Sequence, residues 1–376
     1  MVTLAEEGFY LLRTYASANK GGKMKLLIVN PGSTSTKYAV YADEKPIIDE
    51  TLRHELSELS HFEKLADQYD FRMGIIVDNV TKAGHQLSSF DAVVGMGGLL
   101  KPIPGGTYLV NDALLHDLKT GVQGEHASNL GGIIAHAIST KIGKPSYIVD
   151  PVVVDEFLEI ARVSGHPWFK RRSIFHALNQ KFCARAYCKE VGKSYDEVSV
   201  IVAHMGGGIS VGLHYMGKVV DANNALDGEG PFSPERSGTL PVGDLAALCY
   251  SGKTHDEVKK AIVGKGGIVA YFGSNNVKEL IDRADTDPEA KLIIDAMVYQ
   301  ISKEIGSLST VASGKIDAIL LTGGLAFGEY ITGGITKRVS FIAPVKVYPG
   351  GDEQLALAQG ALRVLRGEEE AKVYTR

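Results

Sequence analysis

Three glycine-rich turns, each directly after an apolar run, are the places where this chain could carry out chemistry on a phosphate. They occupy residues 30–37 (NPGSTSTK), 204–210 (HMGGGIS) and 321–326 (LTGGLA). Such turns expose backbone N–H groups and hydroxyls, which suit phosphate oxygens, and a lysine adds positive charge. One turn of this kind is weakly diagnostic, but three in one chain indicate a phosphate-binding protein in which the third turn seats a nucleoside.

The candidate phosphate-binding residues are small or cationic. They are Gly32, Ser33, Ser35 and Lys37 in the first turn, Gly206, Gly207 and Gly208 in the second, and Gly323 and Gly324 in the third. A plain hairpin tip explains the first turn equally well. Three consecutive glycines after a strand weaken it unless another group approaches the backbone closely, so the second turn is more specific. The chain has no Walker A spacing.

Short apolar runs must position these turns. Residues 25–29 and 38–42 predict a hairpin around the first turn, and 198–203 with 211–215 predict a second hairpin of the same design. The repeat indicates a duplicated domain whose two turns face a common cleft and hold the two ends of a triphosphate. Helical stretches, such as 57–84, alternate with the strands and predict an α/β fold.

Length and composition limit the class of protein. A chain of 376 residues predicts two or three domains, with a boundary near residue 152, and a net charge of −4 argues against nucleic-acid partners. No apolar stretch reaches the 18 residues of a membrane span, and three cysteines predict no disulfide framework, so we expect a cytoplasmic protein. Residues 1–23 look like an N-terminal extension outside the fold, with Met24 as the functional start.

A family resemblance extends from residue 24 to the C-terminus. The sequences VNPGSTSTK, IVDPVVVDE, SIFHALNQK, AHMGGGISVG, LDGEGPFSPERSG, ILLTGGLA and GDEQLALAQGALRVLRGEE resemble butyrate and branched-chain fatty-acid kinases of the acetokinase family. The resemblance implies a two-domain, duplicated ribonuclease H-like fold, as in actin and hexokinase, with an interdomain cleft. The implied domains are 24–151 with 354–376, and 152–353.

The resemblance also implies an activity. It predicts a phosphotransferase that uses ATP and Mg²⁺ to convert a short-chain fatty acid, such as butyrate or isobutyrate, reversibly to its acyl phosphate and ADP. The partner is then a small carboxylate, with neither a membrane nor a nucleic acid involved. A homo-oligomer, at least a dimer, is implied by the resemblance alone.

Residue roles follow from the matching motifs. The implied catalytic residues are Arg236, on the carboxylate or the transferring phosphoryl group, His204 and His176 beside it, and Asp150 and Asn30. The implied metal ligands are Glu353 and Asp150, and the implied acyl pocket consists of Phe175, Leu99 and His126. Two alternatives stay open: Arg236 in a surface ion pair with Glu235, and Phe175 and Leu99 as ordinary core residues.

The sequence departs from the family pattern at two positions. Butyrate kinases read Gly-Arg-Gly-Gly where this chain has Met96 between glycines, and loss of such a donor costs about 2–4 kcal/mol of transition-state stabilisation. Two interpretations follow. One is an enzyme that is slower or has a shifted substrate preference, which is favoured over replacement of the charge by Lys101 or the neighbouring loop. The other is a catalytically weakened relative that binds nucleotide or another subunit. Asn276 stands where relatives tend to carry an aspartate, so a role for its loop, residues 273–277, in binding nucleotide or metal is less favoured. Filament and chaperone ATPases are disfavoured, since they carry Asp at the position of Asn30.

Overall fold

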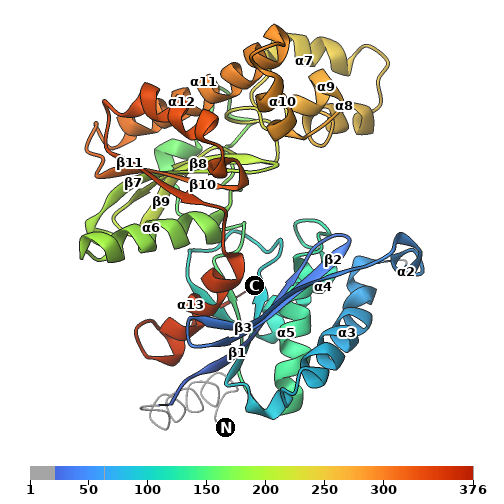
Figure 1. The fold of residues 1–376 in the computed structure, drawn as a ribbon. Coiled ribbons are helices and arrows are strands. Elements are labelled where there is room, and N and C mark those ends of the chain that lie inside the picture. The colour runs from blue at the N-terminus through green and yellow to red at the C-terminus, as the bar shows by residue number, and fades with distance from the viewer. Residues whose placement is uncertain (1–21, 63, 376) are drawn as a thin grey trace. The chain divides into compact units, whose positions relative to one another are not determined.

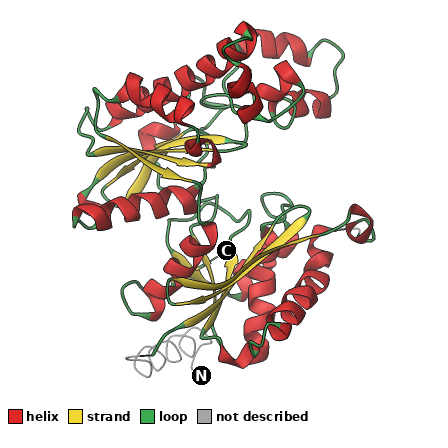
Figure 2. Cartoon of the chain, in the orientation of Figure 1, coloured by secondary structure: helices red, strands yellow, loops and turns green. Residues whose placement is uncertain are grey.

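The computed structural model describes residues 22–62 and 64–375, so most of the predicted N-terminal extension, residues 1–21, lies outside the described residues. The described chain divides into two compact units. One comprises the residues up to Val153 together with those from Asp352 onward, and the other is Val154–Gly351 (Figure 1). Each unit combines one β-sheet with helices, as predicted for an α/β fold (Figure 2).

The first unit is built around a hairpin and a set of crossover strands. Its elements are β1 (Lys25–Pro31), β2 (Ser35–Ala42), β3 (Lys45–Arg53), α2 (Leu56–Leu59), α3 (Tyr69–Lys82), β4 (Ala92–Met96), β5 (Thr107–Leu109), α4 (Asp112–Thr120), α5 (Asn129–Ile142), β6 (Ser146–Val149), α13 (Glu353–Leu365) and β12 (Lys372–Val373).

These strands form a seven-stranded sheet in the order β12-β5-β6-β4-β1-β2-β3. β1, β2 and β3 are antiparallel, whereas β4 runs parallel to β1 and β6 runs parallel to β4. Leu27 and Val29 of β1 pack with Ile76 of α3 and with Ile134 and Ile138 of α5, so both helices cover one face of the sheet. Helix α13 packs against β1, β4 and β6.

The second unit repeats the hairpin and adds more helices. Its elements are α6 (Ala177–Val191), β7 (Ser199–Met205), β8 (Ile209–Tyr215), β9 (Lys218–Ala222), α7 (Val242–Cys249), α8 (His255–Ile262), α9 (Ile268–Phe272), α10 (Val277–Arg283), α11 (Pro288–Val311), β10 (Ala318–Gly323), α12 (Glu329–Val339) and β11 (Val345–Pro349).

Its five strands follow the order β11-β10-β7-β8-β9, with an antiparallel β7-β8-β9 meander and β10 and β11 parallel to β7. The two faces of β7 are covered separately because its side chains alternate. Ile201 and Ala203 pack with α10, α11 and α12, while Val200 and Val202 pack with Cys183 and Cys188 of α6. Both units therefore place a hairpin turn at the end of a buried strand, as the repeat predicted.

One predicted helix is wrong in extent. The stretch 57–84 is not continuous: α2 ends at Leu59, a short 3₁₀ helix covers Leu65–Gln68, and α3 begins at Tyr69. The apolar residues that reach the core from this region lie in α3, at Met73, Ile76 and Val80, so the earlier part has little burial to hold it helical.

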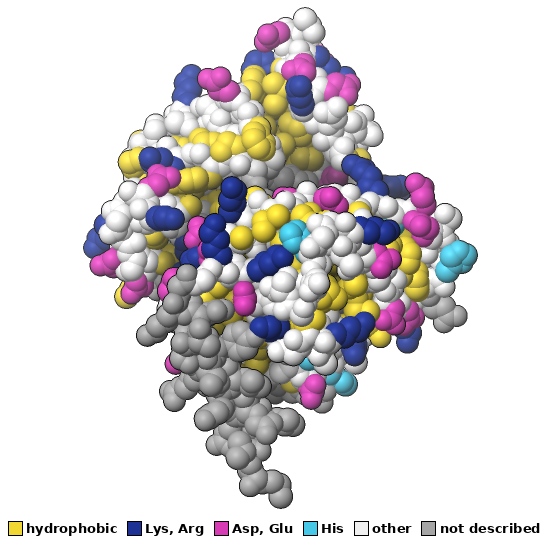
Figure 3. Space-filling model, turned by 60° about the horizontal axis from the view of Figure 1, so that its bottom comes forward, with side chains coloured by type: hydrophobic (Ala, Val, Ile, Leu, Met, Phe, Trp, Pro, Cys, Tyr) yellow, Lys and Arg dark blue, Asp and Glu magenta, His cyan; other side chains and the backbone are white. Residues whose placement is uncertain are grey.

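Charges of both signs are mixed on the one face of the molecule that the space-filling view draws (Figure 3), where lysine and arginine side chains alternate with aspartate and glutamate. None of the helices within the described residues is long and apolar enough to cross a membrane. All three cysteines are free thiols.

Candidate active site

The first glycine turn joins β1 to β2 and is held closed by its own backbone. Asn30 and Lys37 are register partners across the hairpin, and the N–H of Gly32 donates to the carbonyl of Ser35 at 2.8 Å. Ser33 is exposed at the tip, and Lys37 is exposed within β2. The predicted donors of this turn therefore face solvent while the strand below them is buried.

Asn30 and Glu353, which lie 323 residues apart in the chain, meet in the first unit. The side-chain amide of Asn30 donates to Oε2 of Glu353 at 2.8 Å. Glu353 opens α13, and Asp352 caps that helix by accepting from the N–H of Leu355 at 2.8 Å. The Asn30 amide and the first turn of α13 together fix the position of the Glu353 side chain.

Asp150 occupies a strained turn directly after β6. Its φ is +38°, in the left-handed region that few non-glycine residues adopt. The carboxylate is buried and accepts from the N–H of Gly106 at 2.7 Å, while the backbone N–H of Asp150 donates to the carbonyl of Gly106 at 3.0 Å. These two bonds hold Asp150 in its unusual conformation.

Within residues 22–62 and 64–375, no group of three or more His, Cys, Asp or Glu side chains is arranged to hold a metal ion. Mg²⁺ commonly takes one or two protein carboxylates and completes its shell with water and substrate phosphates. The donor set of Glu353 and Asp150 fits an ion that arrives with a nucleotide, and does not fit an ion held by the protein alone.

Met96 ends β4 among glycines that the packing requires. A Cβ at Gly95 would lie 2.2 Å from the carbonyl oxygen of Gly131 in α5, and one at Gly97 would lie 2.6 Å from the side chain of Pro151. The Met96 side chain is half-buried. The glycines around Met96 therefore allow close packing of the protein against itself.

Three predicted residues that follow β4 in the sequence have different hydrogen-bond or ion-pair partners. Lys101, a possible substitute for the missing arginine, has its ammonium 3.8 Å from the carboxylate of Asp117. Leu99 is half-buried, and its N–H donates to the side chain of Asn129 at 2.8 Å. His126 is exposed and bonds to the hydroxyl of Ser128 at 2.8 Å. The Lys101 charge is thus already directed at a carboxylate.

In the second unit, His176 and His204 stack with their ring centroids 3.9 Å apart and their planes 15° from parallel. Burial, together with the positive charge of Arg236, lowers the pKa of His204 to about 4. Burial also lowers the pKa of His176, with further contributions from His204 and Arg236. Both imidazoles are therefore neutral near pH 7 and act through hydrogen bonds.

The hydrogen bonds around the two rings assign opposite tautomers. Nδ1 of His204 lies 2.6 Å from Oδ1 of Asn179, an acceptor, so Nδ1 carries the proton and Nε2 is an acceptor. The Ser210 hydroxyl accepts from the Gln180 amide at 2.8 Å and from the backbone N–H of His176 at 3.3 Å. It therefore donates its own proton to Nδ1 of His176, 2.8 Å away, which leaves Nε2 of His176 as a donor.

This network continues away from the site. Oε1 of Gln180 lies 3.1 Å from Nε2 of the buried His214, whose Nδ1 lies 2.7 Å from the hydroxyl of Tyr195. Each bond in the series runs in one direction, from Tyr195 through His214 and Gln180 to Ser210. The tautomer of His176 is consequently set by Ser210 and, behind it, by Gln180, His214 and Tyr195.

Arg236 lies over the second glycine turn. A Cβ on Gly208 would come 2.1 Å from Nη1 of Arg236, so a side chain at this position would displace the guanidinium. Nη1 donates to the carbonyl of Ala225 at 2.7 Å. Glu235 accepts instead from Asn275 at 2.6 Å, and no ion pair joins it to Arg236 among the described residues. The alternative of a surface ion pair between Arg236 and Glu235 is not formed.

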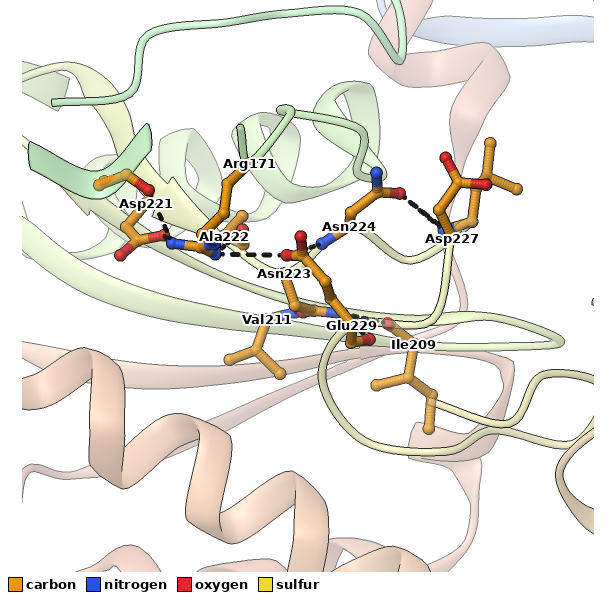
Figure 4. Close-up of polar contacts among 11 residues, drawn as sticks. Arg171, Ile209, Val211, Asp221, Ala222, Asn223, Asn224, Asp227 and Glu229 are labelled. Carbon is orange, nitrogen blue, oxygen red and sulfur yellow. Dashed lines mark hydrogen bonds and ion pairs between the residues drawn. The ribbon is translucent and has the colours of Figure 1, made fainter. Parts of the chain in front are cut away.

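A polar network fixes the loop that supplies the Ala225 carbonyl (Figure 4). Arg171 donates to Asp221 at 2.9 Å, to the carbonyl of Ala222 at 2.9 Å and to Glu229 at 3.4 Å. Asn223 accepts from the N–H of Val211 at 2.7 Å and thereby ties the loop to β8. The loop is anchored on both sides of Ala225, so Arg236 is aimed by a rigid support.

The remaining predicted residues have structural environments of their own. Phe175 is 2% exposed and packs in a core cluster with Val154 and Phe157, as the core alternative proposed. Gly323 has φ of +87° and exchanges backbone bonds with Gly350 at 2.7 and 2.9 Å. A Cβ on Gly324 would meet no other atom within 4 Å, so close packing does not require glycine at this position.

Each unit thus brings together some of the site residues predicted from the sequence. The first brings together Asn30 and Glu353, and the second brings together His176, His204 and Arg236. Asn179, Gln180 and Ser210 were not predicted as site residues, although all three lie in the motifs SIFHALNQK and AHMGGGISVG. The sequence signal that could have identified them is a polar residue close to a candidate histidine within the same motif.

The fold defines the class of protein. The structure superposes on acetate kinase from Porphyromonas gingivalis with a TM-score of 0.76 at 18% identity, covering 91% of this chain and 100% of that chain. A propionate kinase from Francisella tularensis subsp. tularensis gives a TM-score of 0.70 at 18% identity, with 90% and 98% covered. The two-unit architecture is therefore that of the acetate kinases, with the actin- and hexokinase-like fold.

Sequence comparison is more specific. The model of the acetokinase family matches residues 165–336. "Butyrate kinase 2" of Clostridium acetobutylicum is 58% identical over 354 residues, with 94% of this chain and 99% of that protein covered. "Butyrate kinase 1" of the same organism is 57% identical over 352 residues, with 93% and 99% covered. The chain belongs to the acetokinase family.

Proposed function

We propose that this chain catalyses the ATP-dependent phosphorylation of butyrate, or a closely related short-chain fatty acid, to the acyl phosphate and ADP. The observation that carries the proposal is 58% identity to a butyrate kinase along nearly the whole of both chains. That similarity does not favour the alternative of a non-catalytic relative, in spite of Met96.

The reaction joins two anions. A carboxylate oxygen of the fatty acid forms a bond to the γ-phosphorus while the bond from that phosphorus to the β-phosphate oxygen breaks. Substrates and products both carry five negative charges when fully ionised, so no proton has to be released. The chemical task of the protein is to place the two groups in line and offset their repulsion.

Arg236 has the properties that this task requires. Its planar guanidinium can bind a carboxylate or a phosphoryl group with two parallel bonds, and its support on Ala225 keeps it oriented. His176 adds a neutral Nε2–H donor, and His204 adds a neutral acceptor stacked on it. We assign the remaining turn residues, including Lys37, to the nucleotide phosphates.

Magnesium is proposed as the partner of the nucleotide. When bound, it would offset the negative charge of the phosphates. Glu353, braced by Asn30, and Asp150 are the residues that would hold it. Leu99, His126 and Phe175 are the proposed neighbours of the acyl chain, of which Phe175 is immobilised by the core.

The role of Arg236 is testable by conservative replacement. Arg236→Lys keeps the charge and loses the fork, so kcat should fall at least 100-fold, about 2.7 kcal/mol, with a smaller change in the KM for ATP. Lys303→Met on α11, an exposed cation elsewhere in the second unit, is the matched control. Wild-type turnover by Arg236→Lys would refute the assignment.

We also propose a cytoplasmic homo-oligomer, at least a dimer, which the named relatives do not by themselves establish. Sedimentation equilibrium of the full chain over a hundredfold range of concentration would measure its mass. A single species of about 40 kDa throughout would contradict the proposed association.

A further inference from the structure

Arg72 of α3 lies directly behind the first glycine turn, and its side chain is fully buried. Nη1 donates to the carbonyl oxygens of Gly32 and Ser35, each at 2.8 Å. Nη2 donates to the carbonyl oxygen of Ser33 at 3.0 Å. One guanidinium thus binds three backbone carbonyls of a four-residue turn.

The other partners of Arg72 are neutral as well. Nε and Nη2 donate to the side-chain carbonyl of Gln68 at 3.1 and 2.9 Å, and Nη1 donates to Thr36 Oγ1 at 3.0 Å. The Thr36 hydroxyl in turn bonds to Nε2 of His54 at 2.7 Å. Among the residues that the structure describes, no carboxylate forms an ion pair with Arg72.

A buried charge of this kind is expensive unless its hydrogen bonds are complete and an opposite charge lies near. Burial lowers the pKa of Arg72, but a guanidinium remains protonated in proteins. The hydrogen bonds are satisfied by the turn and by Gln68. An anion on the outer side of the turn would supply the missing negative charge.

The geometry of the peptide bond determines which way the N–H groups of the turn point. In a planar trans peptide the C=O and the following N–H point in opposite directions. The carbonyls of Gly32 and Ser33 point inward to Arg72, so the N–H groups of Ser33 and Thr34 point away from it. Ser33 and Thr34 are exposed, and their amides face solvent at the tip of the hairpin.

We infer that Arg72 is a positioning residue for phosphate binding. It fixes the turn so that the amides of Ser33 and Thr34 are oriented before the nucleotide arrives, and it adds a buried positive charge behind them. Arg72 itself touches no substrate. This inference rests on the proposed function, because it takes the ligand of the turn to be a nucleotide phosphate.

The test compares a phosphorylated ligand with its nucleoside. Affinities for Mg-ADP and for adenosine are measured by titration calorimetry on the full chain, for wild type, Arg72→Met and Arg72→Lys. Arg72→Met should weaken ADP binding at least tenfold and leave adenosine binding within twofold. Arg72→Lys keeps the charge but cannot bond three carbonyls, so it should weaken ADP binding about threefold or more.

Lys82→Met is the matched control, since Lys82 is an exposed cation on the same helix. It should change neither affinity. Circular dichroism melting identifies any variant that fails to fold, and if Arg72→Met does not fold, Arg72→Lys decides the question.

The outcomes separate the two claims. A folded Arg72→Lys that binds ADP as tightly as wild type, or that loses ADP and adenosine affinity equally, overturns the positioning role and leaves the proposed function standing. A wild-type protein that binds adenosine and ADP equally weakly overturns the proposed nucleotide function, and the inference with it.

Discussion

The stacked histidines of the second unit are neutral, and their tautomers differ because their Nδ1 partners differ. Asn179 accepts from His204, whereas Ser210 donates to His176. The pair therefore offers one donor and one acceptor at adjacent Nε2 atoms, without adding charge. Positive charge at this place comes from Arg236, and burial together with that charge lowers the pKa of His204 and keeps its imidazole neutral.

Replacing Asn179 by aspartate should reverse that protonation. A carboxylate beside Nδ1 stabilises the imidazolium, so the pKa of His204 should rise from about 4 toward its ordinary value. ¹⁵N-edited NMR of the imidazole, followed from pH 4 to pH 8, measures the shift directly. Asn179→Leu should give no rise, and a His204 titration that is the same in Asn179→Asp as in wild type would disprove the assigned contact.

Met96 is the residue whose replacement should increase activity. Met96→Arg introduces a charged donor at the position where the family resemblance predicts an arginine, and such donors contribute about 2–4 kcal/mol to the transition state. We expect kcat to rise by at least tenfold in a steady-state assay with butyrate and Mg-ATP. Met96→Lys should give a smaller gain, because an ammonium lacks the fork. No gain from either variant would show that the site has adapted to methionine.

At the scale of elements, the glycines of the second turn and those beside Met96 serve different purposes. Gly208 leaves room for the mobile end of Arg236, whereas Gly95 of β4 leaves room for the rigid backbone of α5 at Gly131. A flexible side chain can move away from an added methyl group at little cost. A helix backbone cannot, because the strand and helix are packed face to face.

This difference predicts opposite effects of alanine at the two positions. Gly208→Ala should displace Arg236, lowering kcat at least tenfold while the melting midpoint stays within about 2 °C of wild type. Gly95→Ala should overpack the core and cost about 1–3 kcal/mol of unfolding free energy. Urea denaturation and steady-state kinetics on both variants check the pair. A Gly208→Ala enzyme with normal kcat would mean that Arg236 is not the group displaced.

The elements that sequence reasoning located are those with local signals. An apolar run that ends in glycine predicts a strand and turn from neighbouring residues, and both hairpins were found this way. Arg72 could not be predicted, because an arginine within a helix usually faces solvent, and the carbonyls it binds lie 37 to 40 residues away. The contact between Gly208 and Arg236 was also not predicted, because the two residues lie in different motifs of the sequence.

At the scale of the whole molecule, each unit contributes a different part of the proposed chemistry. The first holds a turn of outward amides backed by Arg72, with Glu353 beside Asn30. The second holds the arginine and the two imidazoles. Similarity to butyrate kinases extends over both units, so it includes the segments that carry both sets of residues.

The central claim is that phosphate is transferred to a carboxylate. The most direct measurement incubates the purified chain with Mg-ATP, butyrate and hydroxylamine, and quantifies butyryl hydroxamate together with ADP. We expect equal amounts of the two products, dependent on butyrate and reduced at least 100-fold in Arg236→Lys. ADP formed without hydroxamate, or no turnover with butyrate, isobutyrate or acetate, would contradict the central claim.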